Sequence, residues 1–443
     1  MDILGGIGIV IGVVTIIFLS VKEVHIAVAA PIAAILVIIF NGMELVPSLM
    51  GKESHQFMGA LGGYIISFFP LFLLGSILAK YMEESGAVTT IANYILEKIG
   101  YENPYRVLVA IFIVSAILTY GGISLFVAMF AIIPLARTLF KKMDLAWNLI
   151  QVPLWLGICS ITMTVLPGSP AFQNVIPVSY LGTSLIALPI PSLIGALGCT
   201  IWGLLYMRHC LHRSLKRNEN FSTYTTYEEE RRVSHSSPNF ISSMIPLVVL
   251  IVLAFAGSIF GNQFWRTNII YVALIVSIVL AVGLFKRYLP SPIRTLSIGS
   301  AASIAPLFVT AASVGFGSMV MWSPGFELLI DKILAIPGSP LISLITVTAV
   351  MSVITGSSSG TLGIIVPNFA QYYLDTGLNP ELIHRVVTIS SNVISVLPHS
   401  GVVLTFMALT KLNYRNGYKD TYIVISVGCA IALCLVLIFS SIL

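Results

Sequence analysis

Two short stretches, "VLPGSP" at residues 165–170 and "VLPHSG" at residues 396–401, each interrupt a long apolar run. Proline lacks the backbone N–H and clashes with the preceding helical turn, so each stretch should break a helix. In a membrane, unpaired backbone groups are tolerated only where protein or a water-filled cavity satisfies them. Two nearly identical breaks, one in each half of the chain, therefore predict that both contribute to one shared central site.

The composition around these breaks excludes a soluble protein. The chain has 443 residues, of which 57% are hydrophobic and 9% are charged, whereas a soluble domain carries about 25% charged residues. Apolar runs at residues 3–19, 25–40, 64–79, 240–260, 268–285 and 421–443 approach the ~20 residues that a membrane span requires. These runs predict an all-α polytopic membrane protein with about ten to twelve crossings.

A polar stretch at residues 207–239 divides the chain into residues 1–206 and residues 240–443. Basic residues at its start indicate a cytoplasmic loop, because cytoplasmic loops are enriched in Lys and Arg. We attribute the net charge of +5 to this topology and expect no nucleic-acid partner. Two halves of nearly equal length also suggest an internal repeat.

Each half contains a second break, "TYGGIS" at residues 119–124 and "TGSSSG" at residues 355–360. The apolar segments on either side of each break are too short to span a membrane singly, which is typical of a re-entrant hairpin. From Gly121 to Val165 is 44 positions, and from Gly356 to Val396 is 40. The same order and similar spacing predict an inverted repeat with two re-entrant hairpins and two broken helices.

The stretch "HRVVTISSNVISVLPHSGVVLTFMALTKLNYRNGYKDTY" at residues 384–422 resembles the C-terminal signature of the gluconate permease family. It is closest to the branch that carries 3-hydroxybutyrate or related carboxylates. "LPGSPAFQNVIP" at residues 166–177 stands where that family has its proline-rich motif. The resemblance implies a secondary carrier of the ion-transporter superfamily, in the plasma membrane, that works by an elevator mechanism. It also implies a homodimer with scaffold and moving transport domains.

The chain departs from that family pattern in its acidic residues. No Asp or Glu occurs at residues 103–143, 145–218 or 382–419, and Asn392 and Ser395 lie where an acid is expected. Few side chains are therefore available to bind a hydroxyl-rich substrate or to relay protons through carboxylates. The sequence favours a short hydroxy acid such as 3-hydroxybutyrate, with gluconate or another sugar acid as the alternative.

The small polar residues at the breaks could simply let helices pack closely. A run of serines flanked by glycines at a helix break instead favours contact with a ligand, because half-helix N-termini direct N–H groups and positive partial charge at an anion. No Lys or Arg lies at the breaks, so we expect backbone N–H groups and hydroxyls to bind the carboxylate. The predicted substrate-binding residues are Tyr120, Gly121, Gly122, Ser124, Pro167, Gly168, Ser169, Thr355, Gly356, Ser357, Ser358, Ser359, Asn392, Pro398, His399 and Ser400.

His399 is the only histidine inside a predicted broken helix. We take it as the candidate proton-coupling group, with a purely structural role as the alternative. A second route to coupling is Na⁺ held by carbonyl oxygens at the unwound stretches. The other histidines show no ligand spacing, so neither a metal site nor a cofactor is expected.

These features together predict a secondary active symporter that moves a small organic anion with protons. The expected partners are the anion, membrane lipid and a second copy of the chain. A channel would need a continuous polar path, which the sequence does not show. "GSSSG" at residues 356–360 also matches the nucleophile elbow of hydrolases, but it lacks the strand-turn-helix context and the His–acid partners. An intramembrane hydrolase is therefore disfavoured, and no enzyme activity is expected.

Overall fold

The computed structural model describes residues 2–99, 103–120, 125–169, 171–225, 237–260, 263–334 and 339–442. The elements of the first half are α1 (Asp2–Val21), α2 (Ile26–Phe40), α3 (Leu45–Met50), α4 (Phe57–Glu84), α5 (Ala87–Ile99), α6 (Pro104–Tyr120), α7 (Leu125–Lys142), the 3₁₀ helix η1 (Trp147–Ile150), α8 (Gln151–Trp155), the π-helix η2 (Leu156–Val165), α9 (Phe172–Leu181) and α10 (Pro189–Lys216). The later elements are the 3₁₀ helix η3 (Phe221–Thr223), α11 (Phe240–Phe260), α12 (Gln263–Phe285), α13 (Pro292–Ala302), α14 (Ile304–Met321), α15 (Pro324–Leu334), α16 (Pro340–Thr355), α17 (Ser358–Asp375), α18 (Pro380–Val393), α19 (Gly401–Thr410), α20 (Tyr414–Gly417) and α21 (Lys419–Ser440). Within the described ranges the protein is entirely helical, as the sequence predicts.

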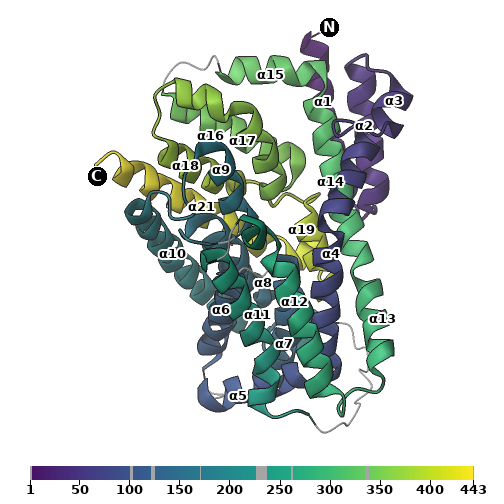
Figure 1. Cartoon of the computed structure of the whole chain (residues 1–443), viewed down its shortest axis with the longest axis vertical. Helices are drawn as coiled ribbons and strands as arrows, with labels where there is room; N and C mark the ends of the chain where they lie inside the picture. Colours follow the sequence, from purple (N-terminus) through teal and green to yellow (C-terminus); the bar gives the residue numbers. More distant parts are fainter. Residues whose placement is uncertain are drawn as a thin grey trace.

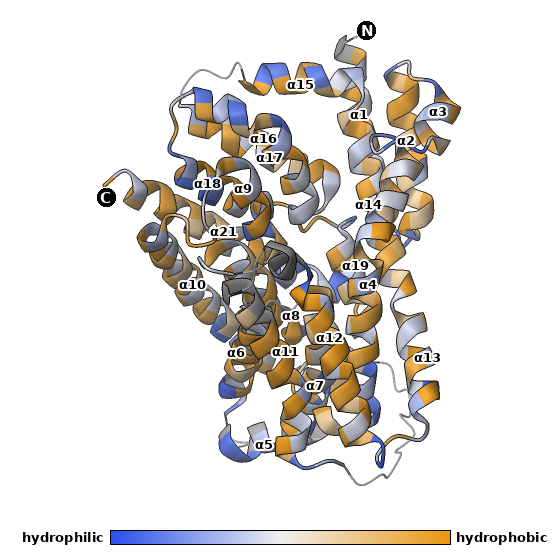
Figure 2. Cartoon of the chain, viewed as in Figure 1, coloured by the Kyte–Doolittle hydropathy of each residue, from blue (hydrophilic) through white to orange (hydrophobic). Residues whose placement is uncertain are grey.

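Seven helical segments in the described part of the chain are long and apolar enough to cross a membrane. Shorter apolar helices, among them Pro104–Tyr120, Pro340–Thr355 and Gly401–Thr410, accompany them. The full-length spans are fewer than the ten to twelve crossings expected, because helices of the hairpins and breaks are individually short. Figure 2 shows largely hydrophobic α11 and α12, with hydrophilic residues gathered on α15 at the upper end and α5 at the lower end. This distribution fits a polytopic membrane protein.

Helices from the two halves pack against each other in reciprocal pairs. α1 packs on α15 at the upper end, and α11 packs on α5 at the lower end (Figure 1). In the same way α2 packs on α14 while α12 packs on α4. The two long central helices, α4 and the segment formed by α13 and α14, also contact each other. The two halves therefore share one buried hydrophobic cluster.

Two helical hairpins carry the predicted tips. α16 and α17 pack together and join at Gly356 and Ser357. Gly356 has a left-handed backbone (φ +57°), a conformation that glycine adopts without the steric cost of a Cβ atom. α6 and α7 also pack together, but the predicted tip between them, with Gly121, Gly122 and Ser124, lies outside the described residues. The second predicted hairpin is thus confirmed as a helix–turn–helix.

Both predicted helix breaks are present. The helical run from Trp147 through η2 ends at Val165, and the chain is extended at Leu166 before α9 begins at Phe172. α18 ends at Val393, and α19 begins at Gly401 after the Pro398 stretch. Gly168 takes a left-handed conformation (φ +83°), and its N–H donates to the Leu185 carbonyl at 2.8 Å. The prolines and glycines of the two stretches therefore interrupt the helices at their own positions, as their backbone chemistry predicts.

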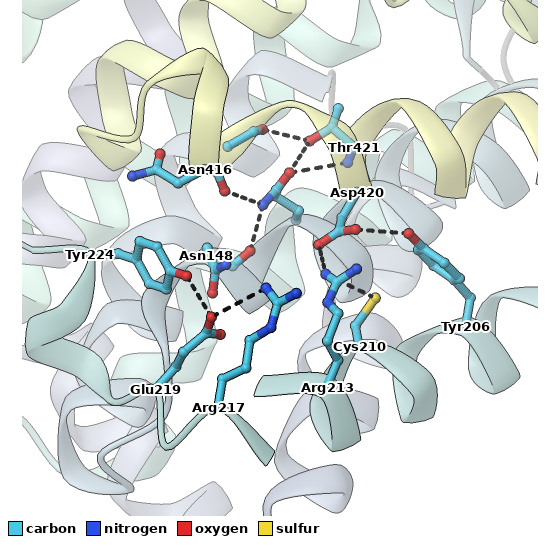
Figure 3. Close-up of polar contacts among 12 residues, drawn as sticks. Asn148, Tyr206, Cys210, Arg213, Arg217, Glu219, Tyr224, Asn416, Asp420 and Thr421 are labelled. Carbon is cyan, nitrogen blue, oxygen red and sulfur yellow. Dashed lines mark hydrogen bonds and ion pairs between the residues drawn. The ribbon is translucent and has the colours of Figure 1, made fainter. Parts of the chain in front are cut away.

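The end of α10 and the start of α21 are joined by buried polar contacts (Figure 3). Asp420 is 4% exposed. Its carboxylate accepts a hydrogen bond from the Tyr206 hydroxyl at 2.8 Å and pairs with Arg213. Because α10 continues through Lys216, the polar stretch at residues 207–239 begins as a helix that packs on α21.

We expect Asp420→Ala to lower the free energy of unfolding by about 3 kcal/mol, since it leaves the Arg213 charge and the Tyr206 hydroxyl without their shared partner. The matched control is Glu83→Ala, which removes an ion pair with Lys80 in which Glu83 is 49% exposed and should cost less than about 1 kcal/mol. Thermal unfolding in detergent measures both. Equal melting temperatures for the two variants would contradict the prediction.

Candidate functional site

A cavity of about 60 Å³ lies between the hairpins and the broken helices. Its polar wall consists of Thr164, Gln173, Thr310, Ser313, Ser357, Ser358, Ser359, Asn392, Ser395 and Ser400. Its apolar wall consists of Tyr64, Phe68, Leu71, Leu125, Phe126, Met163, Phe172, Val396 and Val402, and Cys159, Gly356 and Gly401 complete the lining. Among the residues that the structure describes, no charged side chain lines this cavity. It is therefore amphipathic, with polar groups gathered at the helix breaks.

Three helix N-termini border the cavity. α9 begins at Phe172, α17 at Ser358 and α19 at Gly401, and all three residues line it. The first turn of a helix has N–H groups without intrahelical partners, and the helix dipole places positive partial charge there. The described beginning of α7, at Leu125, lines the same cavity. Because the breaks start new helices at the cavity, the chain can stabilise an anion there without a cationic lining residue.

The hydroxyl groups at the second hairpin tip divide into two kinds. Ser357 caps α17 by accepting the Gly360 N–H at 3.2 Å, and Thr355 bonds to Thr361 at 2.9 Å. These two hydroxyls therefore shape the tip itself. Ser358 is 8% exposed and contacts Ser391 of α18 at 2.6 Å, so it joins the tip to the second broken helix while it faces the cavity.

Ser400 precedes α19 and lines the cavity. It occupies the N-cap position, but its side chain makes no capping hydrogen bond. Asn392 also lines the cavity, and its amide is largely occupied: it donates to the Cys159 carbonyl at 3.0 Å and accepts from the Ser395 hydroxyl at 2.9 Å. The Ser400 hydroxyl is therefore better placed than the Asn392 amide to offer a new hydrogen bond to a ligand.

The structure brings part of the predicted set to the cavity. Gly356, Ser357, Ser358, Ser359, Asn392 and Ser400 line it. Tyr120, Pro167, Gly168, Ser169, Thr355, Pro398 and His399 are not among the lining residues. The hydroxyl of Tyr120 donates to the Pro167 carbonyl at 3.2 Å, which ties the first hairpin to the first break. Of the predicted residues that the structure describes, those that line the cavity all belong to the second half.

His399 lies behind the second hairpin tip rather than in the cavity. Its side chain is fully buried, and a methyl group on Gly356 would lie 2.9 Å from its ring. The ring lies beside the carbonyl groups of Val353 and Ile354 at the end of α16, although neither ring nitrogen has a hydrogen bond of good geometry among the described residues. The imidazole therefore packs against the hairpin tip.

A buried cation that the sequence analysis did not single out lies outside the cavity lining, against the first break. Arg385 of α18 is fully buried, and its guanidinium donates to the carbonyls of Thr164 and Val165 at the end of η2. Asn174 of α9 accepts a third hydrogen bond at 2.8 Å. Packing of α18 against the first break, more than 200 residues away in sequence, produces this arrangement. The sequence could have singled out Arg385 as an arginine within an otherwise weakly charged helical run. Intramembrane ionisable residues commonly mark functional sites.

The aromatic wall was also missed by the sequence analysis. Tyr64 and Phe68 of α4 stack with ring centroids 4.4 Å apart, and Phe68 meets Phe172 of α9 edge to face at 5.4 Å. These rings line one side of the cavity. Their spacing of four residues on α4 places Tyr64 and Phe68 on one helix face, which was the signal available in the sequence.

Comparisons with known proteins agree with this architecture. A family model described as "GntP family permease" matches residues 5–442. A Bacillus subtilis (strain 168) protein described as "Uncharacterized transporter YxjC" is 28% identical over 459 residues, and the match covers 96% of each chain. Among the residues that the structure describes, no group of three or more His, Cys, Asp or Glu side chains could hold a metal ion.

Proposed function

This chain belongs to the GntP family of permeases, and on that premise we propose that it is a secondary active symporter for a short hydroxymonocarboxylate such as 3-hydroxybutyrate, coupled to protons. Membership of the family makes it a transporter of gluconate-like anions rather than an enzyme. Together with its apolar helices, it also makes the chain a multi-pass protein of the plasma membrane. The substrate and the coupling ion are the proposed part.

The observation that carries the proposal is the set of helix N-termini around one cavity. The starts of α9, α17 and α19 surround a space with no acidic lining residue, so an anion meets partial positive charge and N–H donors without repulsion from a carboxylate. Hydroxyls of Ser358 and Ser400 add donors at the same wall. A carboxylate group fits this polar wall.

The size and the apolar wall of the cavity favour a short acid over gluconate. A volume of about 60 Å³ accommodates only a few water molecules, since each requires roughly 10–15 Å³ on this scale. The wall formed by Tyr64, Phe68 and Phe172 offers little to the many hydroxyls of a sugar acid. It suits a short carbon chain. Gluconate, the alternative, requires a wider conformation of the same cavity.

An inverted repeat is supported by the reciprocal packing. If the halves are related by a pseudo-two-fold axis, the α1–α15 contact corresponds to α11–α5, and α2–α14 corresponds to α12–α4. The contact of α17 with α9 likewise corresponds to that of α7 with α19. We propose that the hairpins and broken helices form a transport domain that moves against the remaining helices, as in an elevator, within a homodimer.

Uptake into proteoliposomes tests the proposed function. Labelled 3-hydroxybutyrate and gluconate are supplied with a pH gradient, with a Na⁺ gradient, or with neither. We expect accumulation of 3-hydroxybutyrate that is driven by the pH gradient and stronger than that of gluconate. Accumulation of gluconate alone would select the alternative substrate, and accumulation driven only by Na⁺ would overturn proton coupling.

Ser358→Ala and Ser400→Ala should each weaken binding of the transported acid by about 1 kcal/mol, or about fivefold in Kd, because each removes one hydroxyl donor from the polar wall. Titration calorimetry on the purified variants measures this. Ser297→Ala is the matched control, since Ser297 is exposed on α13 and its hydroxyl bonds only to the Ile293 carbonyl of its own helix. If both cavity variants bind as tightly as the control, these serines are packing residues.

A further inference from the structure

Arg385 is a buried cation whose hydrogen-bond partners are all uncharged. It is fully buried, and it donates to Thr164 O at 3.1 Å, to Val165 O and to Asn174 Oδ1 at 2.8 Å. Its Nε atom has no hydrogen-bond partner in the described ranges. The carboxylate one helical turn earlier, Glu381, accepts the Leu188 N–H at 2.8 Å and forms no ion pair with Arg385 among the described residues.

This charge lies beside the wall of the candidate substrate cavity. Thr164, whose carbonyl accepts a hydrogen bond from Arg385, lines the cavity. Gln173, the neighbour of Asn174, also lines it. No other Lys or Arg occurs in residues 147–181 or 380–410, which contain both broken helices. The two broken helices therefore contribute one fixed positive charge.

A buried charge that lacks an opposite charge is costly, because desolvation is not repaid by an ion pair. Hydrogen bonds to carbonyl and amide oxygens offset part of that cost. A negative charge arriving in the cavity would offset more of it, since charges interact strongly where water is excluded. The Arg385 charge is thus one that an anion in the cavity would compensate.

We propose that Arg385 is the positioning residue that makes the cavity selective for monoanions. The inference rests on the proposed transport of an organic anion and specifies its charge class. Arg385 holds the end of η2 at the cavity wall through Thr164 and Val165, and its single charge balances one carboxylate. A dianion would bring a second charge with no counterpart, so dicarboxylates of similar size are rejected.

Titration calorimetry on the full-length protein in detergent tests this proposal, with 3-hydroxybutyrate and gluconate as monoanions and succinate as the dianion. We expect the wild-type protein to bind a monoanion at least tenfold more tightly than succinate. Arg385→Met, which is neutral and flexible, should weaken monoanion binding at least tenfold. Arg385→Lys keeps the charge and should stay within about threefold of wild type.

A second pair of variants leaves Arg385 in place. Asn174→Asp supplies a carboxylate to the guanidinium and should weaken monoanion binding at least tenfold. Asn174→Ser loses the same amide donors, which bond to Ser169 O and Leu185 O, without adding a charge, and it should bind more tightly than Asn174→Asp. Melting temperatures without ligand report folding for every variant.

Four results would overturn the proposal. If Arg385→Met binds monoanions as tightly as the wild-type protein, the charge of Arg385 does not contribute to anion binding. Asn174→Asp and Asn174→Ser could lose the same amount of monoanion affinity, or Arg385→Lys and Arg385→Met could do so. Either result would show that Arg385 has a structural role and not an electrostatic one. Wild-type protein that binds succinate as well as the monoanions would exclude the charge selectivity. Wild-type protein that binds none of the acids would overturn the proposed function and this inference together, whereas the other results leave that function in place.

Discussion

Proteoliposomes that contain His399→Gln are expected to lose pH-driven accumulation of the substrate, with uptake falling to the level of equilibration. The imidazole is fully buried behind the hairpin tip, beside carbonyl groups at the C-terminal end of α16. A protonated imidazole can donate from both nitrogens, and its charge is favourable at a helix C-terminus. We therefore expect protonation to favour a position of the tip in which these carbonyls accept hydrogen bonds from the ring. Glutamine keeps a donor but cannot titrate.

Exchange of labelled for unlabelled substrate at equal pH on both sides should persist in His399→Gln, because exchange requires no net proton movement. The matched control is His25→Gln, since His25 is exposed and its Nδ1 accepts the Ala27 N–H at the start of α2. This control should accumulate substrate like wild type. Survival of pH-driven accumulation in His399→Gln would exclude His399 as the coupling group. A wild-type response to Na⁺ alone would exclude proton coupling itself.

Gly356→Ala is expected to reduce transport at least tenfold. The backbone at Gly356 is left-handed (φ +57°), which costs an alanine about 1–2 kcal/mol. Its methyl group would also lie 2.9 Å from the His399 ring and 3.2 Å from Ser400 Cα. One of these contacts is to the backbone of the second broken helix, so the conflict cannot be relieved by a side-chain rotation alone. The tip must move away from the cavity wall.

Gly363→Ala provides the control for a glycine in the same hairpin. Gly363 lies within α17, and a Cβ atom there would meet no atom within 4 Å. Alanine favours a helix interior over glycine by about 1 kcal/mol, so this variant should keep wild-type transport and melt no lower. The initial uptake rates and substrate Kd values of Gly356→Ala and Gly363→Ala are then compared. Wild-type transport by Gly356→Ala would show that the tip geometry is not required.

The helical membrane architecture and the positions of the breaks could be predicted because they depend on local chemistry. Apolar runs identify helices that prefer lipid. Pro167 and Pro398 lack a backbone donor, and Gly356 tolerates a left-handed backbone, wherever these residues stand in the fold. The serines after Gly356 likewise marked the start of α17, since Ser357 caps that helix through a contact only three residues away.

The site was predicted less completely. Six of the predicted residues line the cavity, and most of these belong to the second hairpin and the second break. Tyr64 and Phe68, which form much of the opposite wall, lie on α4 in an ordinary apolar run. Their spacing of four residues places both rings on one face of α4, but it does not show whether that face meets lipid or protein. Only the packing of α4 along the broken helices selects the face that becomes the aromatic wall.

By itself, the sequence determined where helices form, where they stop and that each half carries a Pro-containing break. These properties depend on residues within a few positions of each other. The tertiary structure decided which helix ends meet at one cavity and which polar groups lose their water. Arg385 illustrates the difference. In the sequence it is one polar residue within α18. Contact with Thr164, Val165 and Asn174, each more than 200 residues away, buries its charge. Desolvation and electrostatic balance depend on all neighbours in space, and only the packed molecule specifies them.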